Sequence, residues 1–200
     1  MLKPFAVREH EKMKEVLMHP DASGPEIHYY MIRGGVDKGN ITVWETGTVG
    51  REYIKTYGHY HVGKIGETYY VLGGEGVILL QIRKKDAEGN PIDDQIENFY
   101  AIRVKAGASV YMPSGTAHLA ANTGKAWLVT TDDSPVNFEE VDPVALPGHA
   151  DYEPIKKLKG FAYYLVEDNG QPTLVKNPNY KSAPEPEWLT PEEYTQKESK

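Results

Sequence analysis

The sequence predicts an all-β protein built as an antiparallel sandwich or barrel. The first observation is the pattern of residue types: between residues 27 and 129, short runs of β-branched and aromatic residues are separated by glycine at close intervals. The second is length, because 200 residues without an internal repeat or a Gly/Ser linker suit one domain with a full core. The third is a further hairpin pattern, 161–167 and 173–176, around Asn169-Gly170.

The turns and strands follow in chain order. Gly73-Gly74-Glu75-Gly76 has the glycines that a tight hairpin requires. Residues 84–95 are polar and contain Gly-Asn-Pro, so we expect an exposed hairpin loop there. The predicted strands are 27–33, 41–46, 51–57, 67–72, 76–83, 96–104, 108–112, 117–121 and 126–131.

Short helices are expected near both ends. Residues 8–17 are rich in helix formers and Pro20 follows them, while Thr190-Pro191-Glu192-Glu193 has the residue types of a capped helix start. We therefore expect one domain, 1–200, with three parts. These are an N-terminal helical extension (1–26), a β-barrel with the added hairpin (27–180) and a polar C-terminal tail (181–200).

The composition excludes several kinds of function. The chain has no cysteine, so any bound metal must be held by nitrogen and oxygen ligands. Its net charge of −7 argues against a nucleic-acid surface, and no glycine loop of a nucleotide-binding type is present. The longest apolar run, 77–80, is too short to cross a membrane, and the N-terminus has no apolar signal region. We expect a cytoplasmic protein with no nucleic-acid and no membrane partner.

Three of the seven histidines form a candidate metal site. His59 and His61 are two residues apart, so on a strand both side chains point to the same face. Glu67 begins the next strand run and His118 follows a proline–glycine corner, so both could join the pair. Three imidazoles and one carboxylate suit iron(II), manganese, nickel or zinc. The alternative is that His59 and His61 are an ordinary surface or hydrogen-bonded pair on a strand.

Two longer motifs around these residues resemble those of the cupin family. Residues 58–74 have His59-x-His61, then Glu67, then Gly74, and residues 107–122 have Gly107, Pro113-x-Gly115, His118 and Asn122. Tyr53 stands where the usual first motif has a glycine, and five residues instead of three or four separate His61 from Glu67. The resemblance implies a double-stranded β-helix, or jelly-roll barrel, with short N- and C-terminal helices. It implies that His59, His61, Glu67 and His118 bind the metal.

The residues that flank the first motif are Thr42-Val43, Gly47-x-x-Gly50, Glu52-Tyr53, Thr56-x-Gly58 and Glu67-x-Tyr69, and downstream follow Pro147-Gly148-His149-Ala150-Asp151-Tyr152 and Lys159-Gly160-Phe161. Together they resemble the cupin-type glucose-6-phosphate isomerases, over roughly residues 27–178. This resemblance implies a homodimer with a divalent metal, iron(II) before manganese, nickel or zinc. It implies catalytic roles for Glu67 and Tyr69. The family's Gly-His-Asp-Tyr run has an extra alanine here, in Gly148-His149-Ala150-Asp151-Tyr152, and either Tyr29 or Tyr30 could be its early-strand tyrosine; we select Tyr30. The implied substrate and phosphate contacts are Thr42, Thr56, Gly58, His149, Tyr152 and Tyr30.

The residue types suit interconversion of glucose 6-phosphate and fructose 6-phosphate, a step of glycolysis and gluconeogenesis. Threonine hydroxyls and a glycine N–H suit a phosphate, and a carboxylate beside the carbonyl suits proton transfer through an enediol. A metal-assisted hydride shift, with Glu67 only a ligand, remains open. Other functions also remain open: another phosphosugar isomerase, such as one acting on mannose 6-phosphate, a cupin dioxygenase, a non-enzymatic sugar-binding cupin, or a cupin whose histidines have lost their role. Both Thr56 and His59 face the substrate only if Gly58 forms a bulge or a bend.

Overall fold

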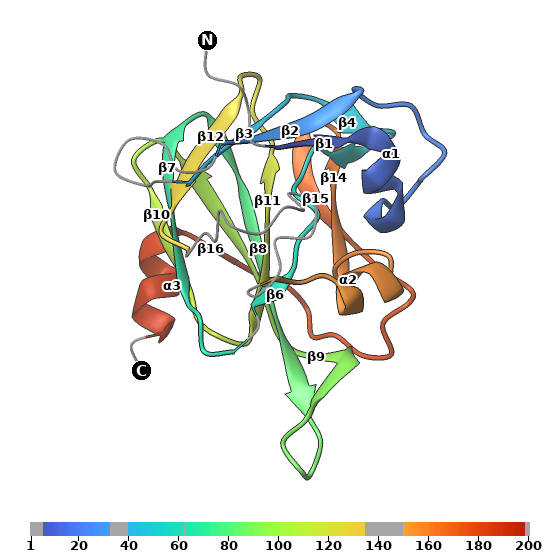
Figure 1. Cartoon of the computed structure of the whole chain (residues 1–200), viewed down its shortest axis with the longest axis vertical. Coiled ribbons are helices and arrows are strands. Elements are labelled where there is room, and N and C mark those ends of the chain that lie inside the picture. Colours follow the sequence, from blue (N-terminus) through green and yellow to red (C-terminus); the bar gives the residue numbers. More distant parts are fainter. Residues whose placement is uncertain (1–5, 33–39, 62, 135–149, 199–200) are drawn as a thin grey trace.

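Two layers of antiparallel strands face each other across the core (Figure 1). The first layer is a six-stranded sheet with the order β1-β2-β3-β12-β7-β10. Its strands are β1 (Ala6–Glu9), β2 (Ile27–Ile32), β3 (Asn40–Trp44), β7 (Glu67–Gly73), β10 (Ser109–Met112) and β12 (Leu128–Asp132). The computed structural model describes residues 6–32, 40–61, 63–134 and 150–198.

The second layer begins with a four-stranded sheet of order β11-β8-β9-β16. Two isolated bridges, Lys55 to Ala121 and His59 to His118, join β11 to the chain segment that carries β5 and β6. That segment pairs onward in a sheet of order β15-β14-β5-β4 and in the pair β13-β6. The strands of this layer are β4 (Thr48–Val49), β5 (Glu52–Tyr53), β6 (Tyr60–His61), β8 (Glu75–Lys85), β9 (Pro91–Lys105), β11 (Thr116–Asn122), β13 (Ala150–Asp151), β14 (Tyr163–Asp168), β15 (Gln171–Lys176) and β16 (Glu187–Leu189).

From β7 to β12 the chain passes between the two layers at every connection except the β8–β9 hairpin, because β7, β10 and β12 lie in the first layer and β8, β9 and β11 in the second. This alternation confirms the jelly-roll prediction. The glycine-rich turn at 73–76 is a corner between the layers, because β7 and β8 belong to different sheets. The expected hairpin there is wrong. Gly74 has φ +79°, and a Cβ on it would lie 2.4 Å from the Trp127 carbonyl oxygen, so this corner requires glycine.

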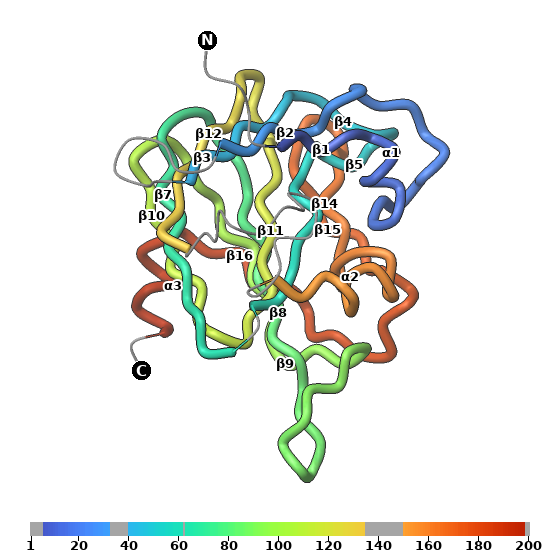
Figure 2. The backbone as a smooth tube through the Cα atoms, viewed as in Figure 1, coloured from blue at the N-terminus to red at the C-terminus, as the bar shows by residue number. Residues whose placement is uncertain are grey.

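The polar loop predicted at 84–95 is shorter than expected. Strands β8 and β9 continue to Lys85 and from Pro91, so five residues, 86–90, form the turn. This long hairpin extends away from the body of the molecule, as the tube in Figure 2 shows. The strand predicted at 51–57 is also shortened, to Glu52–Tyr53, and an irregular stretch follows it.

The N-terminal prediction is wrong at its start. The predicted helix 8–17 is instead the end of β1 followed by α1 (His10–Met13) and the 3₁₀ turn η1 (Lys14–Val16). Strand β1 pairs antiparallel with β2, with Arg8 opposite Tyr29, so tertiary pairing outweighs local helix propensity. This pairing puts Arg8 inside the barrel, where it is 3% exposed.

The predicted C-terminal hairpin and helix are both present. Strands β14 and β15 meet at Asn169-Gly170, which have φ +51° and +77°. Helix α3 (Pro191–Glu198) begins with a reciprocal cap: the Thr190 N–H donates to Glu193, and the Glu193 N–H donates to the Thr190 hydroxyl. The expected polar tail also supplies β16, which pairs parallel with β9. The other helix is α2 (Glu153–Lys157), and none of the helices in the described ranges is long and apolar enough to span a bilayer.

Candidate metal centre and substrate site

Four side chains meet inside the barrel, and all four belong to the expected ligand set. The residues are His59, His61, Glu67 and His118, and their candidate ligand atoms all lie within 4.8 Å of one another. Three of them are buried and His59 is half-buried. The isolated bridge between His59 and His118 aligns two of the imidazoles, and Glu67 is the first residue of β7. The sequence motifs and the fold therefore bring the same residues together.

The spacing of these donors fits one divalent metal ion. Glu67 Oε2 lies 2.8 Å from His61 Nε2 and 3.4 Å from His118 Nε2. Donors about 2.1 Å from one ion lie about 3 Å apart at right angles and about 4 Å apart when opposite. Three imidazoles with one carboxylate are a ligand set typical of iron, manganese, nickel or zinc, which leaves positions open for substrate oxygens.

The tautomer of His61 also suits metal binding. Its Nδ1 lies 3.1 Å from the carbonyl oxygen of Ile65, and a carbonyl only accepts hydrogen bonds. In the neutral ring the proton is therefore on Nδ1, and the lone pair of Nε2 points toward Glu67. Burial lowers the pKa of His61, but the hydrogen bond and charge of Glu67 outweigh burial, so the net pKa is raised.

A bulge at Gly58 turns both Thr56 and His59 toward the interior, as the sequence required. On β11, two residues lie between His118 and Ala121, whereas three lie between their partners His59 and Lys55. The extra residue reverses the alternation of side chains. Gly58 has φ +82°, and a Cβ on it would lie 2.6 Å from the Phe161 ring.

The bulge presents polar groups to the interior. The Thr56 hydroxyl accepts a hydrogen bond from the Ala120 N–H at 3.0 Å, whereas its own proton has only a 3.5 Å contact with the Ala120 carbonyl. Among the described residues, the Gly58 N–H has no hydrogen-bond acceptor. Both groups can therefore donate to a bound oxygen.

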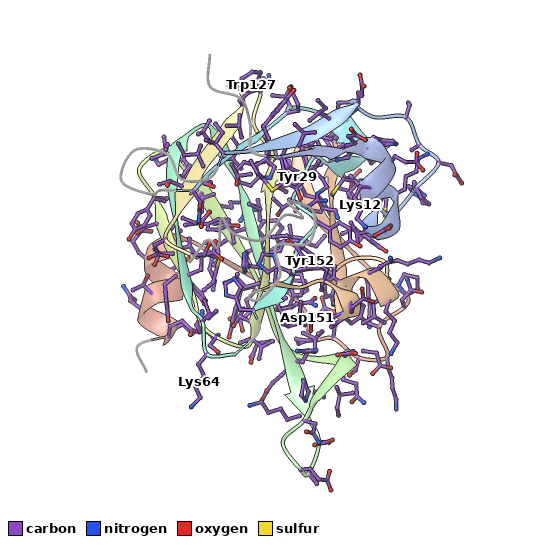
Figure 3. The ribbon with its side chains drawn as sticks, in the orientation of Figure 1. Lys12, Tyr29, Lys64, Trp127, Asp151 and Tyr152 are labelled. Carbon is purple, nitrogen blue, oxygen red and sulfur yellow. The ribbon has the colours of Figure 1, made fainter. Side chains whose placement is uncertain are left out.

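Two tyrosines predicted from the sequence lie against the histidines. The Tyr69 ring is 5.3 Å from the His118 ring, edge to face, and the Tyr152 ring is 5.2 Å from the His59 ring. Figure 3 shows Tyr152 in the middle of the molecule. The extra Ala150 pairs with His61 in the short β13–β6 ladder, and this pairing positions Tyr152. His149 lies outside the described residues.

Opposite the bulge, β3 and β12 provide two adjacent threonines. Thr42 is buried, and its register partner across the ladder is Thr130. The hydroxyl of Thr130 is buried and has no hydrogen-bond partner among the described residues. The sequence predicted a role for Thr42 but not for Thr130. Thr130 belongs to no motif and becomes a neighbour of Thr42 only through the pairing of β3 with β12.

The structure corrects the choice between Tyr29 and Tyr30. Tyr30 lies on the outer face of β2, where its hydroxyl donates to Glu45 at 3.3 Å, and burial raises its pKa. Tyr29 is 3% exposed and shares the inner face with Trp44, its register partner. The lining residue is therefore Tyr29, because alternate residues of a strand point to opposite faces.

Sequence reasoning missed Arg8, which is the one buried arginine in the described part of the chain. Its Nε donates to the Tyr29 hydroxyl at 3.0 Å, and the same hydroxyl accepts from the Tyr57 N–H at 3.4 Å. Burial lowers the pKa of Arg8, but Tyr29, Tyr152 and Tyr57 outweigh burial and raise it. Arg8 therefore remains a cation next to the bulge.

A separate buried ion pair supports the chain segment that leads to the bulge. Lys55 Nζ lies 3.5 Å from Glu52 and donates to the Val16 carbonyl at 2.9 Å. Burial lowers the pKa of Lys55 and raises that of Glu52, although their attraction opposes both shifts. Nearby, burial lowers the pKa of His28 to about 3. These contacts join the N-terminal segment to the second layer.

Comparison with known proteins identifies the family. The family model described as "Glucose-6-phosphate isomerase (GPI)" matches residues 30–183. The chain belongs to this family. Proteins named glucose-6-phosphate isomerase from Thermococcus onnurineus and Pyrococcus furiosus are each 35% identical to it over 142 residues. The alignments cover 70% of this chain and 63% and 62% of those relatives, so the chain matches less than two thirds of their length.

Similar solved structures lie further from this member of the glucose-6-phosphate isomerase family. A predicted oxalate decarboxylase from Thermotoga maritima has a TM-score of 0.34 and 20% identity, covering 52% of this chain and 76% of that one. The Drosophila melanogaster CENP-C cupin domain has a TM-score of 0.35 and 12% identity, covering 56% and 71%. Because these scores are low, the fold assignment rests on the strand order and register.

Proposed function

We propose that this protein is a metal-dependent glucose-6-phosphate isomerase that interconverts glucose 6-phosphate and fructose 6-phosphate. The observation that carries the proposal is the group of three imidazoles and Glu67 inside the barrel, with Tyr69 against His118. Family membership supplies the substrate class. The proposed setting is cytoplasmic glycolysis and gluconeogenesis.

In this proposal His59, His61, Glu67 and His118 hold the metal. Iron(II) is the first choice, with manganese, nickel and zinc as alternatives. When bound, the ion supplies a positive charge that polarises the oxygens on C1 and C2 of the sugar. Tyr69 and Tyr152 border the histidine rings and position the sugar hydroxyls. The phosphate lies further along the interior, at Thr42, Thr56 and the Gly58 N–H, with His149 as a proposed additional contact.

Glu67 is the proposed base. In the aldose-to-ketose direction it takes the proton from C2 and returns it to C1, while a second proton moves from O2 to O1 through an enediol. No atom is gained or lost.

The isotope test separates this route from a hydride shift. Conversion in D₂O is expected to place deuterium at the carbon that receives the proton. The reason is that, in some turnovers, the proton on Glu67 exchanges with solvent before it is transferred back to the sugar. Complete retention of protium over many turnovers would contradict the proton route and support direct hydride transfer, with Glu67 acting as a metal ligand only.

The function itself is tested with metal-loaded protein. The protein is loaded with iron(II) or manganese and assayed for conversion of fructose 6-phosphate to glucose 6-phosphate, with mannose 6-phosphate as the competing substrate. Glu67→Gln is expected to lose at least about 10²-fold in kcat, the usual scale for removing a general base. His61→Ala is expected to lose activity because it removes a metal ligand. His19→Ala, at an exposed histidine, is the matched control. Activity that survives chelation and both site variants would rule out this site.

We also propose a homodimer, as the resemblance implies. The outer face of the six-stranded sheet has exposed Tyr70, Leu72 and Tyr111, which are 45%, 55% and 53% exposed. Their pairing in β7 and β10 puts them on one surface. Exposed apolar groups of this size gathered on a sheet face suit burial against a second copy.

A further inference from the structure

Arg8 is a buried cation without a carboxylate partner in the described part of the chain. Its side chain is 3% exposed, and no described carboxylate lies within ion-pair distance of its guanidinium. Among the described residues, its side chain makes one hydrogen bond, from Nε to the Tyr29 hydroxyl. The terminal nitrogens therefore have donors to spare. Burying a charge without a counter-ion is costly, so such groups are usually paired or bind a ligand.

The contrast with other cations of this chain makes Arg8 distinctive. Buried Lys55 has Glu52 at 3.5 Å, and exposed Arg51 has Asp168 at 3.8 Å. Half-buried Arg83 has Asp93 at 2.6 Å and lies over the Tyr60 ring. Each of these has a carboxylate, whereas Arg8 has phenol groups around it, and a phenol is neutral near pH 7.

The location of Arg8 points to the ligand. The Tyr29 hydroxyl receives hydrogen bonds from Arg8 and from the Tyr57 N–H, so one hydroxyl separates the guanidinium from the bulge that presents Thr56 and Gly58. Tyr152 is one of the phenols around Arg8, and its ring lies 5.2 Å from the ring of the proposed metal ligand His59. The guanidinium is thus on the substrate side of the barrel interior.

We infer that Arg8 binds the phosphate of the sugar phosphate through its terminal guanidinium nitrogens. The identity of the sugar in this inference rests on the proposed function, whereas the binding of a phosphate group by Arg8 does not. A phosphate dianion matches the planar donors of arginine and is the counter-ion that this buried cation lacks. Arg8 thus adds to the phosphate contacts already proposed, which include the Gly58 N–H and the hydroxyls of Thr56 and Thr42. Tyr29 is a positioning residue, because its hydroxyl holds Nε and so aims the remaining donors.

The test uses inorganic phosphate, which requires no turnover. Calorimetric affinity for phosphate is measured on the metal-loaded protein and on Arg8→Gln, with Arg51→Gln as the matched loss of one arginine at the surface. Arg8→Gln is expected to bind phosphate about tenfold more weakly or worse, as for loss of a hydrogen bond to a charged group, while Arg51→Gln binds as the wild type does. A surface groove is lined by Lys14, Lys156, Lys159 and Lys176. Lys159→Gln is expected to bind phosphate as the wild type does, and a loss of affinity there but not in Arg8→Gln would place the anion in this groove and overturn the inference.

Kinetics separates this inference from the proposed function. For fructose 6-phosphate, KM is expected to rise at least tenfold in Arg8→Gln with a smaller change in kcat, because the phosphate is remote from the reacting carbons. Wild-type protein that binds phosphate through Arg8 but does not isomerise the sugar would contradict the proposed function alone. Active wild-type protein whose phosphate affinity and KM are the same in Arg8→Gln, within twofold, would overturn the role of Arg8.

A second variant and a structure cover the case in which Arg8→Gln does not fold. Arg8→Lys keeps the charge but loses the forked donors, so partial recovery of phosphate affinity relative to Arg8→Gln is expected, with full wild-type affinity contradicting guanidinium recognition. A crystal structure of the wild-type protein with fructose 6-phosphate needs no variant. Phosphate oxygens within hydrogen-bond distance of the Arg8 terminal nitrogens support the inference, and a phosphate elsewhere refutes it.

Discussion

Substitution of Gly58 by alanine tests the bulge that shapes the site. A Cβ at this position would lie 2.6 Å from Cε1 and 3.2 Å from Cζ of Phe161, and 3.3 Å from the His118 carbonyl oxygen. The residue also has φ +82°, where an alanine costs about 1–2 kcal/mol. Phe161 is 1% exposed and cannot move into solvent, so overpacking adds about 1–3 kcal/mol. Together, Gly58→Ala is expected to lower the free energy of unfolding by about 2–5 kcal/mol.

A second glycine separates the two contributions to this loss. Gly170 has a similar φ of +77°, but nothing lies within 4 Å of a Cβ built there, so Gly170→Ala is expected to lose only about 1–2 kcal/mol. Urea unfolding of both variants without metal measures the difference. In a double-mutant cycle, Phe161→Leu is expected to recover part of the loss in Gly58→Ala. Equal losses in the two glycine variants, or no coupling with Phe161, would refute the steric argument.

Three further predictions concern other parts of the molecule. The folded pKa of His28, near His10 and Lys55, is lowered by burial to about 3, so stability is full above pH 6.5 and falls as the pH decreases toward 3. The free energy of unfolding falls by at most about 1.4 kcal/mol per pH unit. Urea unfolding between pH 7 and pH 5 should show that His28→Gln makes the free energy of unfolding less dependent on pH. The same pH dependence in the wild type and the variant would contradict this prediction. Asn122 donates to the Ala126 carbonyl at 2.9 Å and accepts from the Gly124 N–H at 3.0 Å. Asn122→Ala is therefore expected to lose about 1–3 kcal/mol on thermal unfolding, and an unaltered midpoint would argue against these bonds. Leu72→Asp is expected to convert the proposed dimer to a monomer, and the molar mass measured by light scattering shows the change. A wild-type protein that is already a monomer would contradict the dimer proposal.

Much of the fold could be predicted because its signals are local. The hairpin at Asn169-Gly170 and the cap at Thr190 depend on residues a few positions apart, and both are present. The corner at Gly74 has the same local signature as a hairpin, yet it joins two sheets. Positive φ identifies the need for glycine but not the sheet to which the next strand belongs, since that choice depends on long-range packing.

At the N-terminal segment, too, long-range pairing outweighs the local sequence signal. Residues 8–17 have good helix propensity, and a short helix does form, but it starts only at His10. Pairing of β1 with β2 determines the extended conformation of Arg8. The local sequence around Arg8 does not predict this pairing, because the partner strand is about twenty residues away.

The sequence by itself predicted an all-β sandwich or barrel, and its resemblance to the cupin motifs implied the jelly-roll class and the candidate ligands His59, His61, Glu67 and His118. It also required a bulge or bend at Gly58 if Thr56 and His59 both face the substrate. Their spacing within short motifs carries that information. Only the tertiary structure decided that Arg8, Tyr29 and Thr130 line the interior. Each of these depends on the register between strands distant in sequence. A slip of one residue would turn every side chain of a strand to the opposite face, and register is set by the whole packed core and not by the strand's own residues.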